Sequence, residues 1–132
     1  MSAPDAAGAL RGLLPVLCLG MLTVMALPAS AGEADVEAVE VSLQADGAYG
    51  FDVTIRHADE GWSHYADRFE IFDASGAVLG TRTLFHPHVD EQPFTRSLAV
   101  EIPDGVESVV VRAHDLVHGV GGSEMTVALP AR

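Results

Sequence analysis

Short segments in which apolar and polar residues alternate recur along most of this chain, and turn-forming residues separate them. Seven segments follow this pattern, at about residues 39–43, 51–57, 64–72, 78–85, 94–102, 106–114 and 124–129. An alternation of period two is typical of half-buried β-strands, and no apolar stripe of helical period accompanies it. Seven short strands in about a hundred residues predict an all-β, antiparallel sandwich of the immunoglobulin or fibronectin type. The acidic stretch 32–40 is expected to be a loose lead-in to the first strand.

The N-terminal residues have the composition of an export signal rather than of a domain. Arg11 is the only basic residue before an apolar run from Leu13 to Leu27, and small residues at 29–31 follow that run. This order is typical of a signal-peptidase substrate, and the run is short for a membrane span of ~20 residues. We therefore predict a cleavable signal peptide at 1–31 and a single domain at 32–132, the alternative being an uncleaved anchor. Cys18 follows Leu17, where lipoprotein processing favours a small residue, so we expect it to leave with the signal.

The charge of the chain is strongly one-sided. It contains 19 acidic residues, seven arginines and no lysine, and its net charge is −12. Without residues 1–31 the balance is still 6 − 18 = −12, because only Asp5 and Arg11 are lost. Such a surface repels phosphate backbones and anionic lipid. We therefore expect no nucleic-acid partner, and no membrane partner after signal cleavage. Since 32–132 contains no cysteine, a disulfide and a thiol nucleophile are both excluded there.

All the histidines of the chain fall near predicted strand ends. If consecutive strands run up and down, every histidine lies at the same end of the sandwich, away from the opposite turns at Asp46, Ser75 and Asp104. The six residues are His57, His64, His86, His88, His114 and His118. A random scatter would rarely place them all at one pole.

The chemistry of this histidine pole favours a metal ion. In His86-Pro87-His88 the two imidazoles project from the same side of an extended segment and could share one ion. Imidazoles with carboxylates and no thiolate suit Zn(II) or Cu(II). We take His86, His88 and His114 as core ligands, with His57, His64 and His118 as further ligands or as support behind them. Carboxylates in the same loops could complete the shell or hold the far ring nitrogens: Asp59, Glu60, Asp90, Glu91 and Asp115.

Two other interpretations of the histidines stay open. They could be structural residues that cap strands through hydrogen bonds, or a switch that gains charge below about pH 6. Catalysis is not favoured, since no activated serine motif is present. Trp62 is expected to pack under the loop before the third strand. Arg96 shares the inward face of its strand and needs a carboxylate partner, with Asp90 or Glu91 as candidates.

Three segments carry a resemblance to known sequences. The segments are His86-Pro87-His88-Val89-Asp90-Glu91-Gln92-Pro93-Phe94-Thr95-Arg96, Gly61-Trp62-x-His64-Tyr65-Ala66 and His114-Asp115-x-x-His118-Gly119. Together they resemble a group of small uncharacterised bacterial exported β-sandwich proteins. The resemblance implies a bacterial envelope location and brings no activity with it.

Two hypotheses of different classes follow from the sequence. The first is a periplasmic or secreted protein that binds a divalent ion, Zn(II) or Cu(II), for storage, delivery or sensing. The second is an envelope accessory module that contacts another protein through a structural or pH-responsive histidine cluster.

Overall fold

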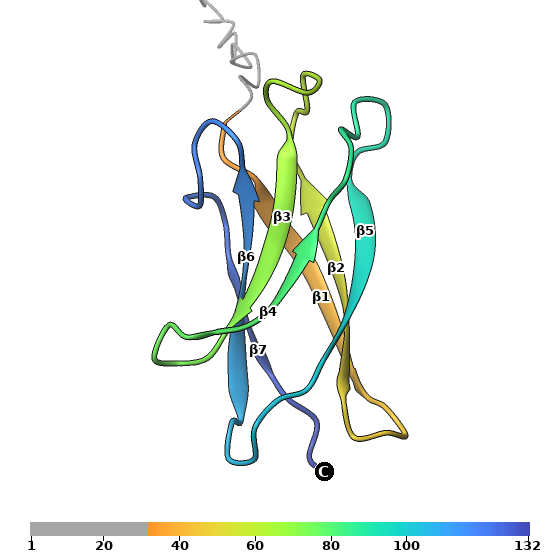
Figure 1. The fold of residues 1–132 in the computed structure, drawn as a ribbon, viewed down its shortest axis with the longest axis vertical. Coiled ribbons are helices and arrows are strands. Elements are labelled where there is room, and N and C mark those ends of the chain that lie inside the picture. The colour runs from red at the N-terminus through yellow and green to blue at the C-terminus, as the bar shows by residue number, and fades with distance from the viewer. Residues whose placement is uncertain (1–31) are drawn as a thin grey trace, which may run out of the picture.

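The predicted β-sandwich is confirmed in the computed structural model, which describes residues 32–132. The predicted signal peptide at 1–31 lies outside the described residues. Seven strands form two antiparallel sheets (Figure 1): β1 (Asp35–Leu43), β2 (Tyr49–Arg56), β3 (Ala66–Phe72), β4 (Val78–Thr83), β5 (Phe94–Val100), β6 (Ser108–Asp115) and β7 (Met125–Ala128). Residues 32–132 contain no helix that is long and apolar enough to cross a membrane.

The strand order places three loops and the histidines at one end of the sandwich. One sheet has the order β1-β2-β5 and the other β4-β3-β6-β7, and all neighbours are antiparallel. Across the two sheets, β1 contacts β6 and β7, and β4 contacts β5. The loops β2–β3, β4–β5 and β6–β7 therefore emerge together at the upper end in Figure 1. We call this end the histidine pole, because all six histidines lie at it or within these loops.

The core fills the space between the sheets with the inward members of each alternating strand. Phe51, Val53 and Ile55 of β2 are fully buried, as are Phe69 and Ile71 of β3. Their neighbours along each strand are more exposed, as the period-two pattern requires. The hydrophobic effect of this layer holds the two sheets together and fixes which residues of each strand face inward.

The expectation of a loose lead-in at 32–40 was wrong. Strand β1 already begins at Asp35, which pairs with Arg56 of β2. Ala34 and Val36 are buried against the core, and Arg56 forms an ion pair with Glu37. Burial of two small apolar side chains and pairing with β2, interrupted only by a register irregularity between Val36 and Ala38, outweigh the acidic composition of this segment.

Candidate metal centre

Alternation within the strands decides which polar residues at the histidine pole point inward. In β6, Val109, Val111 and Ala113 face the core, so Asp115 faces it as well and is fully buried. In β2 the inward face continues beyond the strand to His57, which is 2% exposed. The buried face of β6 thus places the Asp115 carboxylate at the top of the core, and the buried face of β2 places the His57 imidazole there.

A tight turn between β2 and β3 returns the chain to this point and adds a second imidazole. Gly61 has a φ of 115°, a conformation that side chains disfavour. The turn closes because the His64 amide donates to the Gly61 carbonyl at 3.2 Å, and the Glu60 amide donates to the His64 carbonyl at 2.8 Å. These bonds fix the position of His64, two residues before β3 begins, and its exposed fraction is only 7%.

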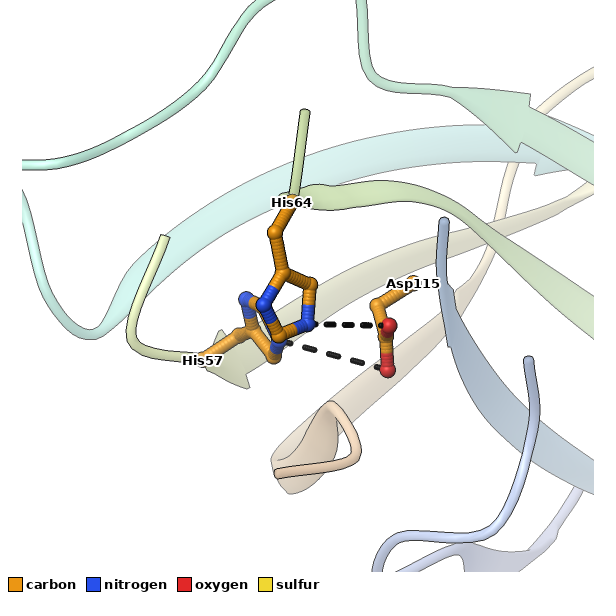
Figure 2. Close-up of side chains that lie close together, drawn as sticks. All are labelled: His57, His64 and Asp115. Carbon is orange, nitrogen blue, oxygen red and sulfur yellow. Dashed lines mark hydrogen bonds and ion pairs between the residues drawn. The ribbon is translucent and has the colours of Figure 1, made fainter. Parts of the chain in front are cut away.

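Three side chains meet at the pole with ligand atoms inside one small volume (Figure 2). One atom from each of His57, His64 and Asp115 lies within 4.8 Å of the other two. His64 Nε2 is 3.2 Å from Asp115 Oδ1, and His57 Nε2 is 3.9 Å from Asp115 Oδ2. Tetrahedral coordination at Zn–N distances of 2.0–2.1 Å separates ligand atoms by about 3.3 Å, so only small movements would close this group around an ion.

The far ring nitrogens of both imidazoles face carboxylates. His57 Nδ1 is 2.5 Å from Asp59 Oδ1, and His64 Nδ1 is 3.6 Å from Glu60 Oε2. Carboxylates in this position orient metal-binding histidines and increase the basicity of the nitrogen that binds the ion. The arrangement therefore directs the Nε2 atoms of both rings inward, toward Asp115.

Asp59 also ties together the strands that surround the site. Its Oδ1 accepts a hydrogen bond from the Ala66 amide at 3.0 Å, and its Oδ2 accepts one from the His88 amide at 2.7 Å. Burial alone would raise the pKa of Asp59, but the hydrogen bonds from His57 and these two amides outweigh burial and lower it. Asp59 is therefore a buried, ionised link between the β2–β3 loop, the start of β3 and the β4–β5 loop.

Asp115 is ionised as well, and one of its oxygens lacks a partner. Burial raises the pKa of Asp115, but the His118 and Val117 amides, which donate to Oδ1, outweigh burial and lower it. Oδ2 is buried without a hydrogen-bond partner among the described residues. A buried carboxylate oxygen left in this way is costly unless a cation or a donor reaches it.

The two buried carboxylates of this group, Asp59 and Asp115, require two positive charges for neutrality. Asp59 and Asp115 contribute −2, and neutral imidazoles contribute nothing. Burial lowers the pKa of His57, but the hydrogen bond to Asp59 and the charges of Asp59 and Asp115 outweigh burial and raise it. Its Nε2 also lies 2.9 Å from the Gly32 carbonyl, so only a protonated His57 can donate from both nitrogens at once. One divalent cation, or protons on two imidazoles, would neutralise the cluster.

The remaining histidines lie around this group rather than within it. His118 Nδ1 is 3.2 Å from Asp115 Oδ1, and its 34% exposed side chain borders the group on the solvent side. The rings of His86 and His88 are neighbours, 4.5 Å apart between centroids. His86 is exposed. His114 points away from the core on the outer face of its sheet, where its Nδ1 meets Asp67 Oδ1 at 2.5 Å.

The imidazole of His88 contacts an aromatic ring and an arginine. Its ring stacks on Phe94 with centroids 3.9 Å apart, and its Nε2 lies 3.0 Å from an Arg96 nitrogen. Burial, together with the positive charge of Arg96, lowers the pKa of His88, so the ring is neutral and accepts from the guanidinium. Arg96 also lies 3.4 Å from Glu91, which confirms the predicted carboxylate partner.

Sequence reasoning had named every member of this group, although it ranked His86, His88 and His114 first. Asp59 and Asp115 were among the carboxylates expected to support the site. Sequence reasoning missed Asp67, the partner of His114, because these residues meet only where β3 pairs with β6, at a register irregularity between Ala66 and Arg68. The alternation in β6 could have identified the inward residue, since Asp115, and not His114, is an even number of residues from Val111 and Ala113.

His57 and Asp59 also border a cavity of about 510 Å³, which Gly32, Val89 and Gln92 help to line. Cavities of this size accommodate small molecules. Gly32 thus touches the cavity and, through its carbonyl, the imidazole of His57.

Comparison with known proteins gives one informative likeness. No family model matches the chain, and no solved structure matches it. A curated protein of the archaeon Halomicrobium mukohataei, named "Putative lipoprotein", is 44% identical over 95 residues, which are 70% of this chain and 47% of that protein. The chain therefore spans about half the length of the curated relative it matches. The resemblance seen in the sequence was to bacterial proteins, whereas this similar protein is archaeal.

Proposed function

We propose that this is an exported protein that binds one divalent transition-metal ion, Zn(II) or Cu(II), through His57, His64 and Asp115. The observation that carries the proposal is the orientation of the two imidazoles. Both present Nε2 to a buried aspartate and Nδ1 to a second carboxylate. That is the arrangement in which histidines bind metal ions in proteins.

Charge and ligand chemistry support the same proposal. A divalent ion would neutralise Asp59 and Asp115 and would reach the unpartnered Oδ2 of Asp115. Two imidazole nitrogens and a carboxylate oxygen, with no sulfur ligand, suit Zn(II) or Cu(II). The side chain of His118 is 34% exposed and its Nδ1 lies 3.2 Å from Asp115 Oδ1, so it borders the proposed site on the solvent side. The predicted export signal and the lipoprotein name of the similar archaeal protein support a location outside the cytoplasm.

Calorimetric titration of residues 32–132 with ZnCl₂ and CuCl₂, after treatment with a chelator, tests this function. We expect one ion per chain. His64→Gln should weaken binding by more than about 100-fold because it removes a ligand from a three-ligand site. His86→Ala and His114→Gln are matched controls that leave the three ligands in place, and their affinities should equal that of the parent protein.

Circular dichroism and a metal-free thermal unfolding curve would first establish that each variant folds. Absence of binding heat in the parent protein would refute the proposal. So would a loss of affinity that follows His86 or His114 instead of His64.

A second candidate function rests on the contact between His57 and Gly32. His57 has an oxygen at each ring nitrogen, so protons could satisfy the cluster in place of an ion. The protein would then be an envelope accessory module with a structural or pH-responsive cluster. A titration without heat, in a protein that is otherwise folded, would favour this candidate.

A further inference from the structure

Large apolar side chains are exposed mainly at the histidine pole. Eight are exposed in residues 32–132, and six of them lie in the three loops of this pole. The most exposed are Phe85 at 75%, Trp62 at 68% and Val117 at 60%. We call the six residues the apolar loop set: Trp62, Phe85, Val89, Leu116, Val117 and Val120. The other two, Leu43 and Val78, lie near the opposite end of the sandwich.

Packing within the domain does not account for the apolar loop set. Trp62 was expected to pack under its loop, and that expectation was wrong, because its ring contacts Tyr65 edge-on and remains largely exposed. Covering these side chains with another apolar surface would be favourable, because it would remove apolar area from water. An exposed concentration of such residues in one region indicates a surface that another apolar phase covers.

The distribution of the apolar loop set favours a bilayer over a folded partner. Its six residues come from three different loops, which lie at the upper end of Figure 1 in blue, green and teal. Lipid has no fixed shape, so it can surround side chains from several loops without a matching surface. Trp62 adds the residue type that concentrates at membrane–water interfaces, because its ring is apolar and its N–H is polar.

The path of the chain brings the same pole to a membrane. Gly32 contacts His57 at this pole, so residues 1–31 join the sandwich here. The apolar run that ends at Leu27 precedes Gly32 by five residues, which span at most about 18 Å. If this apolar run engages a membrane, as the predicted export signal requires, the loops of the histidine pole lie within that distance of the bilayer.

Charges in the same loops restrict the kind of lipid. Glu60 and Glu91 have side chains 61% and 59% exposed, and Asp90 is exposed nearby. These carboxylates, together with the net charge of −12 of the whole chain, repel an anionic lipid surface. The sequence-based expectation of no membrane partner rested on this repulsion, which does not apply to uncharged lipid.

We propose that the apolar loop set inserts into the headgroup region of an uncharged lipid bilayer, so that the histidine pole faces the membrane. The proposal is independent of the metal ion and is tested in the presence of a chelator. Trp62 is the only tryptophan of the chain, so its fluorescence reports directly on the pole.

The experiment mixes residues 32–132 with phosphatidylcholine vesicles and measures co-flotation and Trp62 emission. We expect flotation with a blue shift, weaker flotation with phosphatidylglycerol vesicles at low salt, and recovery of the latter at high salt. The triple variant Phe85→Ser, Val117→Ser, Val120→Ser keeps the tryptophan and should reduce partitioning by roughly 100-fold or more. Leu43→Ser with Val78→Ser, at the other end, is the matched control and should float like the parent protein.

Three results would overturn the proposal. The first is no flotation of the parent protein, and the second is an equal loss in the triple variant and in the control. The third is a blue shift that appears without vesicles and grows with protein concentration, since it would assign the loops to a second copy of the chain. Circular dichroism of each variant shows that a loss of flotation does not reflect unfolding.

Discussion

At the scale of single residues, Asp59 and Asp67 form a natural comparison. Each places a carboxylate oxygen 2.5 Å from the Nδ1 of a histidine, His57 in one case and His114 in the other. Asp59 is buried behind an imidazole whose Nε2 faces Asp115, whereas Asp67 lies on the outer face of its sheet. The same pair of residue types therefore borders the proposed ion site in one environment and forms a surface contact in the other.

This comparison gives a prediction for metal affinity. Asp59→Asn should weaken Zn(II) binding by about 10–100-fold at unchanged stoichiometry, because the amide no longer orients and polarises His57 through a negative charge. Asp67→Asn should leave the affinity unchanged. Competition with a chromophoric chelator measures both constants. Equal losses in the two variants, or a larger loss in Asp67→Asn, would move the site away from His57.

At the scale of elements, close contact between β4 and β5 joins the two sheets at one edge. A Cβ atom on Gly80 would lie 2.8 Å from Val100 Cγ2 and 3.3 Å from Leu98 Cδ2. Val100 is buried and β-branched, so it has little freedom to move away. Gly50 in β2 is different, because the nearest atom to its Cβ position is Nε2 of the flexible Gln44 side chain.

Gly80→Ala should therefore destabilise the domain by about 1–3 kcal/mol through overpacking between the sheets. Gly50→Ala offers the same change within a strand and should alter stability by less than about 0.5 kcal/mol. Urea unfolding at a constant m-value measures the difference. The close approach of β4 and β5 is not a structural constraint if both variants unfold at the same urea concentration.

At the scale of the whole molecule, the dominant electrostatic feature is an excess of negative charge. Five of the six arginines in residues 32–132 lie within ion-pair distance of carboxylates. Many of the 18 acidic residues in this range have no such partner, so repulsion between carboxylates opposes the compact state. Surface ion pairs contribute little individually, so we expect net repulsion to outweigh them.

Salt should consequently stabilise the metal-free domain. Raising potassium chloride from 10 mM to 500 mM shortens the Debye length from about 30 Å to less than 8 Å. The unfolding midpoint should rise by about 5 °C, as for roughly 1 kcal/mol of relieved repulsion in a domain of this size. Tetramethylammonium chloride should act equally, because screening depends on ionic strength. A midpoint that falls with salt would show that the ion pairs dominate.

Much of this architecture was predictable because local patterns encode it. The alternating segments predicted the sandwich, since a strand with one buried face must repeat with period two. The same patterns predicted that the histidines would gather at one pole, because antiparallel strands return the chain to the same end. The buried Asp115 also follows from the parity of β6.

The alternating pattern is therefore enough to predict the class of fold and the end of the molecule at which the histidines gather. The tertiary structure alone decided which histidines meet: His57 and His64 converge on Asp115, His88 is held by Phe94 and Arg96, and His114 turns outward to Asp67. The physical reason is that strand alternation fixes the facing of a side chain locally. Contacts between loops depend instead on sheet register, on turns such as that at Gly61, and on which buried charges must be neutralised together.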